Sequence, residues 1–181
     1  MRDMSDEILD KAVDAALALA AERPWREVSL REIAERAGVA FADLYAEASS
    51  KPMLVLRLSR RLDRAALETA ATASDDVHDR LFDATMARVE AMEPHRAALL
   101  SMARDEPRLA LASHLPLTAR AILEAAGVPA TAPRLAAMTF LWARVAQVWR
   151  DDEGALNRTM AEIDKRLKQM RERLGRIGAG F

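Results

Sequence analysis

The stretch that decides the fold is residues 28–39, which read VSLREIAERAGV. Ser29, followed three residues later by Glu32, forms a capping box, which predicts the start of an α-helix. Gly38 tolerates the left-handed backbone conformation with which many helices end, so it predicts a tight turn after a short helix. A second short helix is expected over residues 40–47. Two short helices joined by a glycine-containing turn predict a helix-turn-helix.

The composition of the 181-residue chain predicts an all-α protein. Hydrophobic residues make up 51% of the chain and charged residues 30%, as in ordinary globular proteins, while aromatic residues make up only 4%. The absence of cysteine excludes disulfides, thiolate metal sites and a cysteine nucleophile. The three histidines, His78, His95 and His114, lack the spacing of metal ligands. We therefore expect no metal, no cofactor and no enzymatic activity.

The sequence gives no sign of a membrane-spanning or secretory segment. No stretch approaches the ~20 consecutive apolar residues that cross a bilayer. Residues 1–10, MRDMSDEILD, are acidic and lack the apolar core of a secretory signal. We therefore expect a cytoplasmic protein.

Helix start and stop signals divide the chain into about nine helices without strands. The first long helix is expected to begin at Ser5 and to stop before Pro24. Pro116 is expected to break the chain before a later helix, because proline removes a backbone donor. We expect a three-helix headpiece over residues 1–49 and a helical ligand-binding and dimerisation domain over residues 50–181. Further helices are expected at about 51–72, 74–93, 95–102, 117–126, 131–150 and 155–176.

The helix-turn-helix carries a family resemblance. Residues 28–39, together with Leu44-Tyr45 and Ser50-Lys51, resemble the N-terminal domain of the TetR/AcrR transcriptional regulators. The resemblance is specific over about residues 8–60, and the length and helix content of the whole chain suit the same family. It implies an all-helical homodimer that binds palindromic double-stranded DNA. It also implies a divergent second domain that often responds to a small effector, which we expect to be apolar here.

Carried over by position, the resemblance assigns the DNA contacts. Ser29 is expected to contact phosphate at a helix N-terminus, and residues 40–43 are expected to face the major groove. Tyr45 and Lys51 are expected to hold the DNA backbone. For these contacts to form, Phe41 and Tyr45 must lie on an outward surface. The full set of expected DNA-binding residues is Ser29, Arg31, Ala40, Phe41, Ala42, Asp43, Tyr45 and Lys51.

The headpiece departs from the family pattern in charge. Residues 1–51 hold seven Lys and Arg against eleven Asp and Glu, a net charge of −4. Asp43 and Glu47 add negative charge to the expected recognition helix, although non-specific DNA affinity comes mostly from cations at phosphates. Phe41 and Ala42 favour apolar contacts with thymine methyl groups, and the second helix has no Arg or Asn for a bidentate base contact. These departures weaken the DNA-binding interpretation without excluding it.

The last expected helix favours a second interpretation. Its second half carries six cations from Lys165 to Arg176, and an apolar stripe runs along it through Ile163, Leu167, Met170, Leu174 and Ile177. A basic amphipathic helix is typical of proteins that lie on anionic membrane surfaces. It is also typical of a helix that buries its stripe in a core or dimer and exposes its basic face.

The C-terminal half is also similar to a second family with the same fold. Residues 135–142, 148–152 and 163–167 resemble those of a lipid-binding accessory family of ubiquinone biosynthesis. That resemblance implies a non-enzymatic lipid or isoprenoid binder at the inner membrane surface that does not bind DNA. We keep it as the alternative function.

Bulky apolar residues of the second domain supply the candidate effector and dimer contacts. Adaptable methionine and aromatic side chains suit an apolar effector, although the same pattern is typical of an ordinary core. The expected effector residues are Phe82, Met86, Met102, Met138 and Trp142. The last two helices are expected to form a four-helix bundle with a second subunit. The expected dimer residues are Leu135, Met138, Trp142, Trp149 and Leu167.

Overall fold

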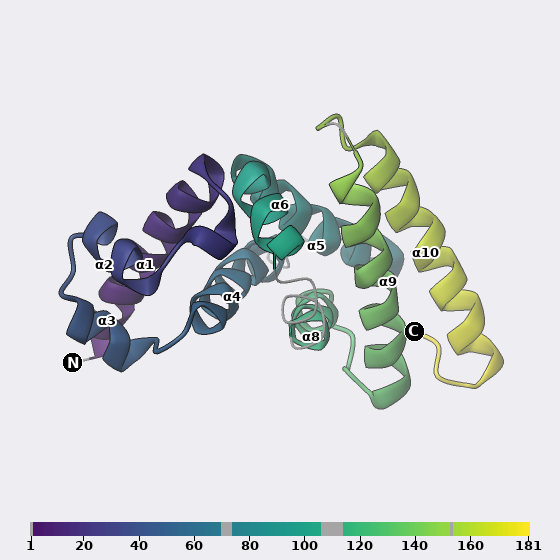
Figure 1. The fold of residues 1–181 in the computed structure, drawn as a ribbon. Helices are drawn as coiled ribbons and strands as arrows, with labels where there is room; N and C mark the ends of the chain where they lie inside the picture. The colour runs from purple at the N-terminus through teal and green to yellow at the C-terminus, as the bar shows by residue number, and fades with distance from the viewer. Residues whose placement is uncertain (1, 70–73, 106–113, 153) are drawn as a thin grey trace. The chain divides into compact units, whose positions relative to one another are not determined.

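The computed structural model describes residues 2–69, 74–105, 114–152 and 154–181, and these residues are helical with no strand (Figure 1). This confirms the all-α prediction. The α-helices are α1 (Arg2–Glu22), α2 (Leu30–Ala37), α3 (Phe41–Glu47), α4 (Lys51–Thr69), α5 (Val77–Met92), α6 (Arg96–Asp105), α8 (Leu115–Ala125), α9 (Ala132–Arg150) and α10 (Asn157–Arg176). Two short 3₁₀ helices lie at Trp25–Glu27 and Glu93–His95.

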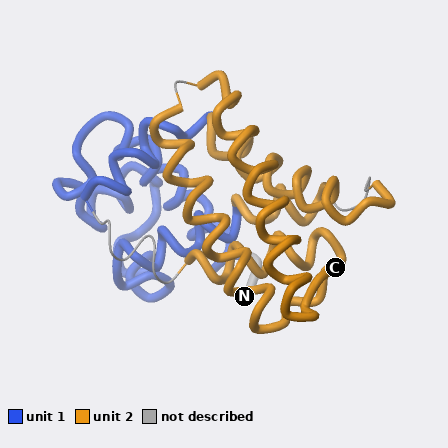
Figure 2. The backbone as a smooth tube through the Cα atoms, turned by 90° about the vertical axis from the view of Figure 1, so that its right-hand side faces the viewer, with its two compact units in different colours: residues 1–61, 94–111 blue, residues 62–93, 112–181 orange. Residues whose placement is uncertain are grey.

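The chain divides into two compact units, coloured separately in Figure 2. Unit 1 comprises residues 1–61 and 94–111, so it contains the helix-turn-helix and also α6. Unit 2 comprises residues 62–93 and 112–181. Helix α4 therefore begins in unit 1 and ends in unit 2.

The helix-turn-helix of unit 1 forms as its sequence predicts. The Ser29 side chain accepts a hydrogen bond from the Glu32 backbone N–H, and the Glu32 carboxylate accepts one from the Ser29 backbone N–H. Gly38 ends α2 with φ +67°, a left-handed conformation that residues with a Cβ adopt only at a cost. Ile33 and Leu44 are fully buried. Contacts among α1, α2 and α3 complete a three-helix headpiece.

Unit 2 is built on contacts of α9 with α8 and α10, and of α5 with α8 and α10. The apolar residues of α9 face its core, and Met138, Trp142, Val145 and Trp149 are all buried. A helix that is apolar on more than one side packs against more than one neighbour, which is why α9 contacts both α8 and α10.

Some helix boundaries differ from the prediction. Helix α1 begins at Arg2, three residues before the expected Ser5. Pro116 does not interrupt the chain before a helix; it lies in the first turn of α8, where the missing backbone N–H needs no intrahelical acceptor. Helix α6 continues to Asp105, beyond the expected end at residue 102. The residues that precede α8, 106–113, lie outside the described residues.

Candidate nucleic-acid interface

Helix α3 presents an outward surface at the headpiece. Tyr45 is 52% exposed, Phe41 is partly exposed, and the two rings pack with their centroids 5.7 Å apart. Ala42 and Asp43 are exposed as well. The structure therefore provides the outward surface that a DNA-binding interpretation requires.

The N-terminus of α3 has open backbone donors. Ala40 is the N-cap residue and has no side chain that could accept from the first backbone N–H groups. At the other end, the Ser5 hydroxyl donates a hydrogen bond to the Glu47 carboxylate and so links α1 to α3. This contact leaves the negative charge of Glu47 in place but fixes its position.

Arg31 lies beside the recognition helix although it belongs to α2. Its guanidinium carbon is 4.5 Å from the centroid of the Phe41 ring, within the range of a cation–π contact. Arg31 is exposed. Arg31 is one of the expected DNA-binding residues, but its contact with Phe41 was not predicted, because the two residues are ten positions apart on different helices.

Ser29 lies at the N-terminus of α2, where its hydroxyl is already in use. It donates to the Glu32 carboxylate at 2.7 Å and accepts from the Glu32 backbone N–H at 3.2 Å. A hydrogen bond from Arg23, followed by those from Ser29, lowers the pKa of Glu32 from its usual 4.5 to about 2. A fixed negative charge therefore stands at the place where Ser29 is expected to contact phosphate, and that role of Ser29 stays a prediction.

Lys51 directs its ammonium group toward the chain itself. Its Nζ donates to the backbone carbonyls of Trp25 at 2.7 Å and of Val28 at 3.0 Å. The same nitrogen lies 4.5 Å from the centroid of the Trp25 ring. Lys51 thus holds the segment that leads into α2, and its expected contact with the DNA backbone stays a prediction.

Most cations of the headpiece are paired with carboxylates. Arg57 contacts Asp6 and Asp10, and Arg61 contacts Asp14. When α4 is counted as far as residue 61, residues 1–61 hold ten Lys and Arg against eleven Asp and Glu, which is nearly neutral. The further ion pairs are Lys11–Glu7, Arg23–Glu32, Arg26–Glu27, Arg26–Asp105 and Arg36–Glu22.

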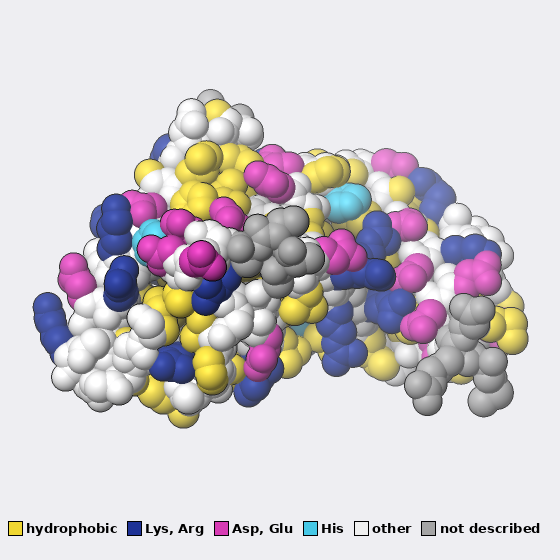
Figure 3. Space-filling view, turned by 180° about the vertical axis from the view of Figure 1, so that it is seen from behind, with side chains coloured by type: hydrophobic (Ala, Val, Ile, Leu, Met, Phe, Trp, Pro, Cys, Tyr) yellow, Lys and Arg dark blue, Asp and Glu magenta, His cyan; other side chains and the backbone are white. Residues whose placement is uncertain are grey.

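Two headpiece cations stand apart from this pairing. Among the described side chains of residues 4–61, Arg31 and Arg60 have no carboxylate or carbonyl partner. Lys and Arg lie interspersed with Asp and Glu on the face seen in Figure 3. Positive charge that is free to contact a polyanion is therefore confined to single side chains. Arg31 places one such charge beside α3.

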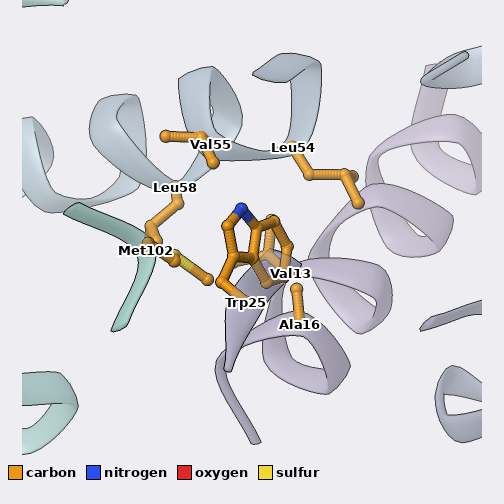
Figure 4. Close-up of a pocket in the computed structure, with 7 residues that line it drawn as sticks. All are labelled: Val13, Ala16, Trp25, Leu54, Val55, Leu58 and Met102. Atoms are coloured by element: carbon orange, nitrogen blue, oxygen red, sulfur yellow. The ribbon is translucent and has the colours of Figure 1, made fainter. Parts of the chain in front are cut away.

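The expected effector residues divide between the units. Phe82, Met86, Met138 and Trp142 belong to unit 2, and all but the partly buried Phe82 are buried. Met102 belongs to unit 1, where it packs near Trp25 and Leu58 in a pocket with no room for a water molecule (Figure 4). Unit 2 has a surface groove of about 110 Å³, lined by Ala137, Phe140, Leu141, Arg166, Gln169, Met170 and Arg173.

Most of the expected dimer residues lie inside unit 2. Met138, Trp142, Trp149 and Leu167 are each 3% exposed or less, and only Leu135 is partly exposed. A side chain buried within one subunit offers little area to a second one. The large apolar residues that α9 and α10 expose are instead Phe140 and Met160. The dimer itself stays a prediction, but these four residues act as core in the single chain.

The basic last helix packs as part of the core. Ile163, Leu167, Met170 and Leu174 of its stripe are buried, and only Ile177, just past α10, is exposed. An apolar stripe that is buried in the protein cannot enter a lipid layer. The expected membrane contact through this helix therefore lacks its apolar anchor. No helix in the described part of the chain has the length and hydropathy of a membrane span.

A buried polar cluster in unit 2 was missed by the sequence analysis. Arg88 Nε donates to Asp63 Oδ1 at 2.6 Å, and the Thr118 hydroxyl donates to the same oxygen at 2.9 Å. The Arg88 guanidinium carbon lies 4.5 Å from the centroid of the Trp142 ring. Burial lowers the pKa of Arg88, and the Asp63 carboxylate opposes that shift. Among the described residues, no cluster of His, Asp and Glu is arranged to hold a metal.

The comparisons with known proteins bear on the headpiece first. Residues 12–58 match the family model of bacterial regulatory proteins, tetR family. The N-terminal part of this chain is therefore similar to the N-terminal domain of tetR-family regulatory proteins. The match covers α2, α3 and the turn between them, which are the elements that the sequence pattern predicts. A search among curated proteins found no match.

Solved structures extend the likeness to the whole chain. A TetR transcriptional regulator from Rhodococcus sp. RHA1 has a TM-score of 0.72 at 20% identity, over 91% of this chain and 96% of its own. A TetR transcriptional regulator from Nitrosomonas europaea ATCC 19718 has a TM-score of 0.72 at 22% identity, over 90% and 96%. A TetR-family regulator from Streptomyces coelicolor has a TM-score of 0.61 at 18% identity, over 96% and 83%. The chain therefore has the fold of TetR-family regulators, and the lipid-binding alternative gains no support.

Proposed function

We propose that the protein is a homodimeric transcriptional regulator that binds palindromic DNA through α2 and α3 and releases it in response to a small effector bound in unit 2. The observation that carries the proposal is the outward surface of α3, with Arg31 stacked on Phe41 beside it. Such a protein works in the cytoplasm and has no enzymatic role.

Base recognition in this proposal combines apolar and charged contacts. Ala42 is small and exposed, so it allows close approach to a thymine methyl group. Arg31 offers all its donors, because no carboxylate among the described residues contacts it. Planar guanidinium groups bind phosphate or guanine in a bidentate manner. Arg31 is thus the strongest candidate for an electrostatic contact, and Tyr45 is the candidate for a backbone contact.

The dimer and the effector complete the proposal. Two recognition helices related by a two-fold axis read half-sites about one helical turn, ~34 Å, apart. We place the second subunit against the exposed side of α9 and α10, at Phe140 and the groove beside it. The effector lies in unit 2, near Phe82, Met86, Met138 and Trp142. Its binding shifts the population toward a form in which the half-site spacing no longer fits.

The proposal is tested by selecting duplexes from a random pool with the full chain at low salt. We expect an inverted repeat, and a dimer in light scattering of the same sample. Ala42→Glu should abolish binding, whereas Ala21→Glu, at a position on α1 that is also exposed, should leave binding intact. Selection of no duplex, selection of sequences without an inverted repeat, or a monomer at micromolar concentration would overturn the proposal.

A further inference from the structure

The core of unit 2 contains a polar atom that lacks a hydrogen-bond partner. His114 is 9% exposed, and its Nδ1 is fully buried with no partner among the described residues. The side chain does not cap α8, although His114 is the N-cap residue of that helix. Nearly all buried polar groups in native proteins are hydrogen-bonded, because desolvation without a partner costs free energy. The unpaired Nδ1 therefore calls for a physical explanation.

His114 belongs to the polar cluster around Asp63. It precedes Thr118 by one turn of α8, and its backbone carbonyl accepts from the Thr118 N–H at 3.0 Å. Residues four apart on a helix share one face, so His114 lies on the face from which Thr118 reaches Asp63. The charges of Asp63 and Arg88 act on the imidazole as well. Four helices, α4, α5, α8 and α9, contribute to this cluster.

The cluster is electrically neutral. The charges of Asp63 and Arg88 cancel each other at a contact distance of 2.6 Å. Burial lowers the pKa of His114 below its usual 6.5, the charge of Asp63 opposes this shift, and the charge of Arg88 adds to it, so the imidazole is uncharged at neutral pH. A buried anion or cation added here would carry an uncompensated charge, which the interior disfavours. A neutral hydrogen-bonding group adds no uncompensated charge and is therefore tolerated here.

We propose that the effector site of unit 2 includes His114 and takes an uncharged molecule with an apolar body and a hydroxyl group that hydrogen-bonds to Nδ1. A hydroxyl group suits either tautomer, because it both donates and accepts. The Trp142 ring, which lies 4.5 Å from the Arg88 guanidinium carbon in the same cluster, offers an apolar surface for the body of such a molecule. This inference rests on the effector response proposed above and makes the effector amphiphilic rather than purely apolar.

Matched pairs of small probes test the proposal on the full chain without DNA. Phenol is compared with toluene, and cyclohexanol with methylcyclohexane, by calorimetric titration and by the ¹⁵N shift of the His114 ring. We expect each alcohol to bind at least tenfold more tightly than its hydrocarbon partner and to shift the Nδ1 resonance. Equal binding within a pair, binding of neither member, or an unchanged Nδ1 resonance would overturn the proposal.

Substitutions at His114 separate a ligand contact from a structural role. His114→Phe removes Nδ1, so the tenfold preference should vanish while the ligand-free protein unfolds at a higher temperature. His114→Asn places a polar atom near the position of Nδ1 and should keep most of the preference. His95→Phe, the same substitution in unit 1, is the control and should change neither. A preference that survives in His114→Phe contradicts the proposal.

The outcome is independent of DNA binding. If the protein selects no duplex, its affinities for the four probes can still be measured, because the titrations contain no DNA. Conversely, a chain that binds an inverted repeat but shows no preference for alcohols keeps its regulatory function and loses only this inference. Release of the selected duplex by phenol and not by toluene would connect the two.

Discussion

Units 1 and 2 both contain exposed ion pairs, but unit 2 also contains a pair in the opposite surroundings, buried in its interior. In unit 1, Arg57 contacts Asp6 and Asp10 at 2.9–3.0 Å with its side chain 30% exposed. In unit 2, Arg88 contacts Asp63 at 2.6 Å with both side chains less than 10% exposed. Water and salt screen the exposed pair, so its charges are stable without each other. In the buried pair, each charge is compensated by its partner and not by water. Similar distances therefore carry different consequences for stability and for function.

The surface pairs of unit 1 also decide what the headpiece offers to DNA. They pair three carboxylates of α1, those of Asp6, Asp10 and Asp14, with arginines of α4, which lie beyond the helix-turn-helix in sequence. Arg31 and Arg60 are left without such partners among the described residues. The comparison teaches that the ion pairs of unit 1 determine the charge of the headpiece surface. The Asp63–Arg88 pair, in contrast, places compensated charges in the interior of unit 2.

Breaking the buried pair should have the largest effect. Arg88→Met leaves the Asp63 carboxylate buried without its cation, so we expect a loss of about 3–5 kcal/mol in the free energy of unfolding. Urea unfolding followed by circular dichroism measures it. The double variant Asp63→Leu/Arg88→Met removes both charges and should lose clearly less. Equal losses in the single and double variants would mean that the pair is not the source of the effect.

Removing the Arg31 guanidinium should have the next largest effect, which is a loss of DNA affinity. Arg31→Ala should weaken binding to the selected duplex by about 1–3 kcal/mol if Arg31 contacts a base in a bidentate manner. The salt dependence of binding should also become shallower by about one ion. Fluorescence anisotropy over a salt series gives both quantities. Arg36→Ala, which removes a cation already paired with Glu22, should change affinity much less.

Breaking a surface pair should cost little stability. Arg57→Ala removes the bridge to Asp6 and Asp10, and exposed pairs of this kind contribute about 0–1 kcal/mol. The same urea titration gives the value, and high salt should reduce the difference from the unsubstituted protein. A loss as large as that of Arg88→Met would show that the contrast between the two units is wrong.

The smallest expected effect appears only in acid. The pKa of Glu32 is about 2 in the folded chain against a usual 4.5, so its ion pair and cap stabilise the headpiece above pH 4.5. This stabilisation should be lost as the pH falls from 4.5 toward 2, because the carboxylate is then protonated first in the unfolded state. Glu32→Gln should flatten the fall of the melting temperature over that window. An unchanged profile would contradict the assignment.

The parts of the fold that the sequence predicts correctly depend on residues that are close to each other in the chain. The capping box of Ser29 and the left-handed turn at Gly38 involve residues within a few positions of each other, and both are confirmed. The position of Pro116 was misread because a proline signals a break or a first turn equally well.

Contacts between distant residues explain what the sequence does not predict. Arg88 and Asp63 are 25 residues apart, and Arg57 and Asp10 are 47 apart, so no helical spacing indicates either pair. Similarly, the stripe of α10 has the same spacing whether it faces lipid or core, and only the packing of α10 on α9 and α5 decides between them. Arg31 was expected to contact DNA, but its cation–π contact with Phe41 was not predicted, because the two residues are ten positions apart on different helices.

The position of Lys51 has a practical consequence. The chain has four lysines, and Lys11, Lys165 and Lys168 are exposed, whereas the amine of Lys51 is held by two carbonyls and an indole face. An acylating reagent should therefore label the other three first. The rate at which Lys51 is labelled, followed by mass spectrometry, should therefore measure how often the segment between Trp25 and α2 opens locally.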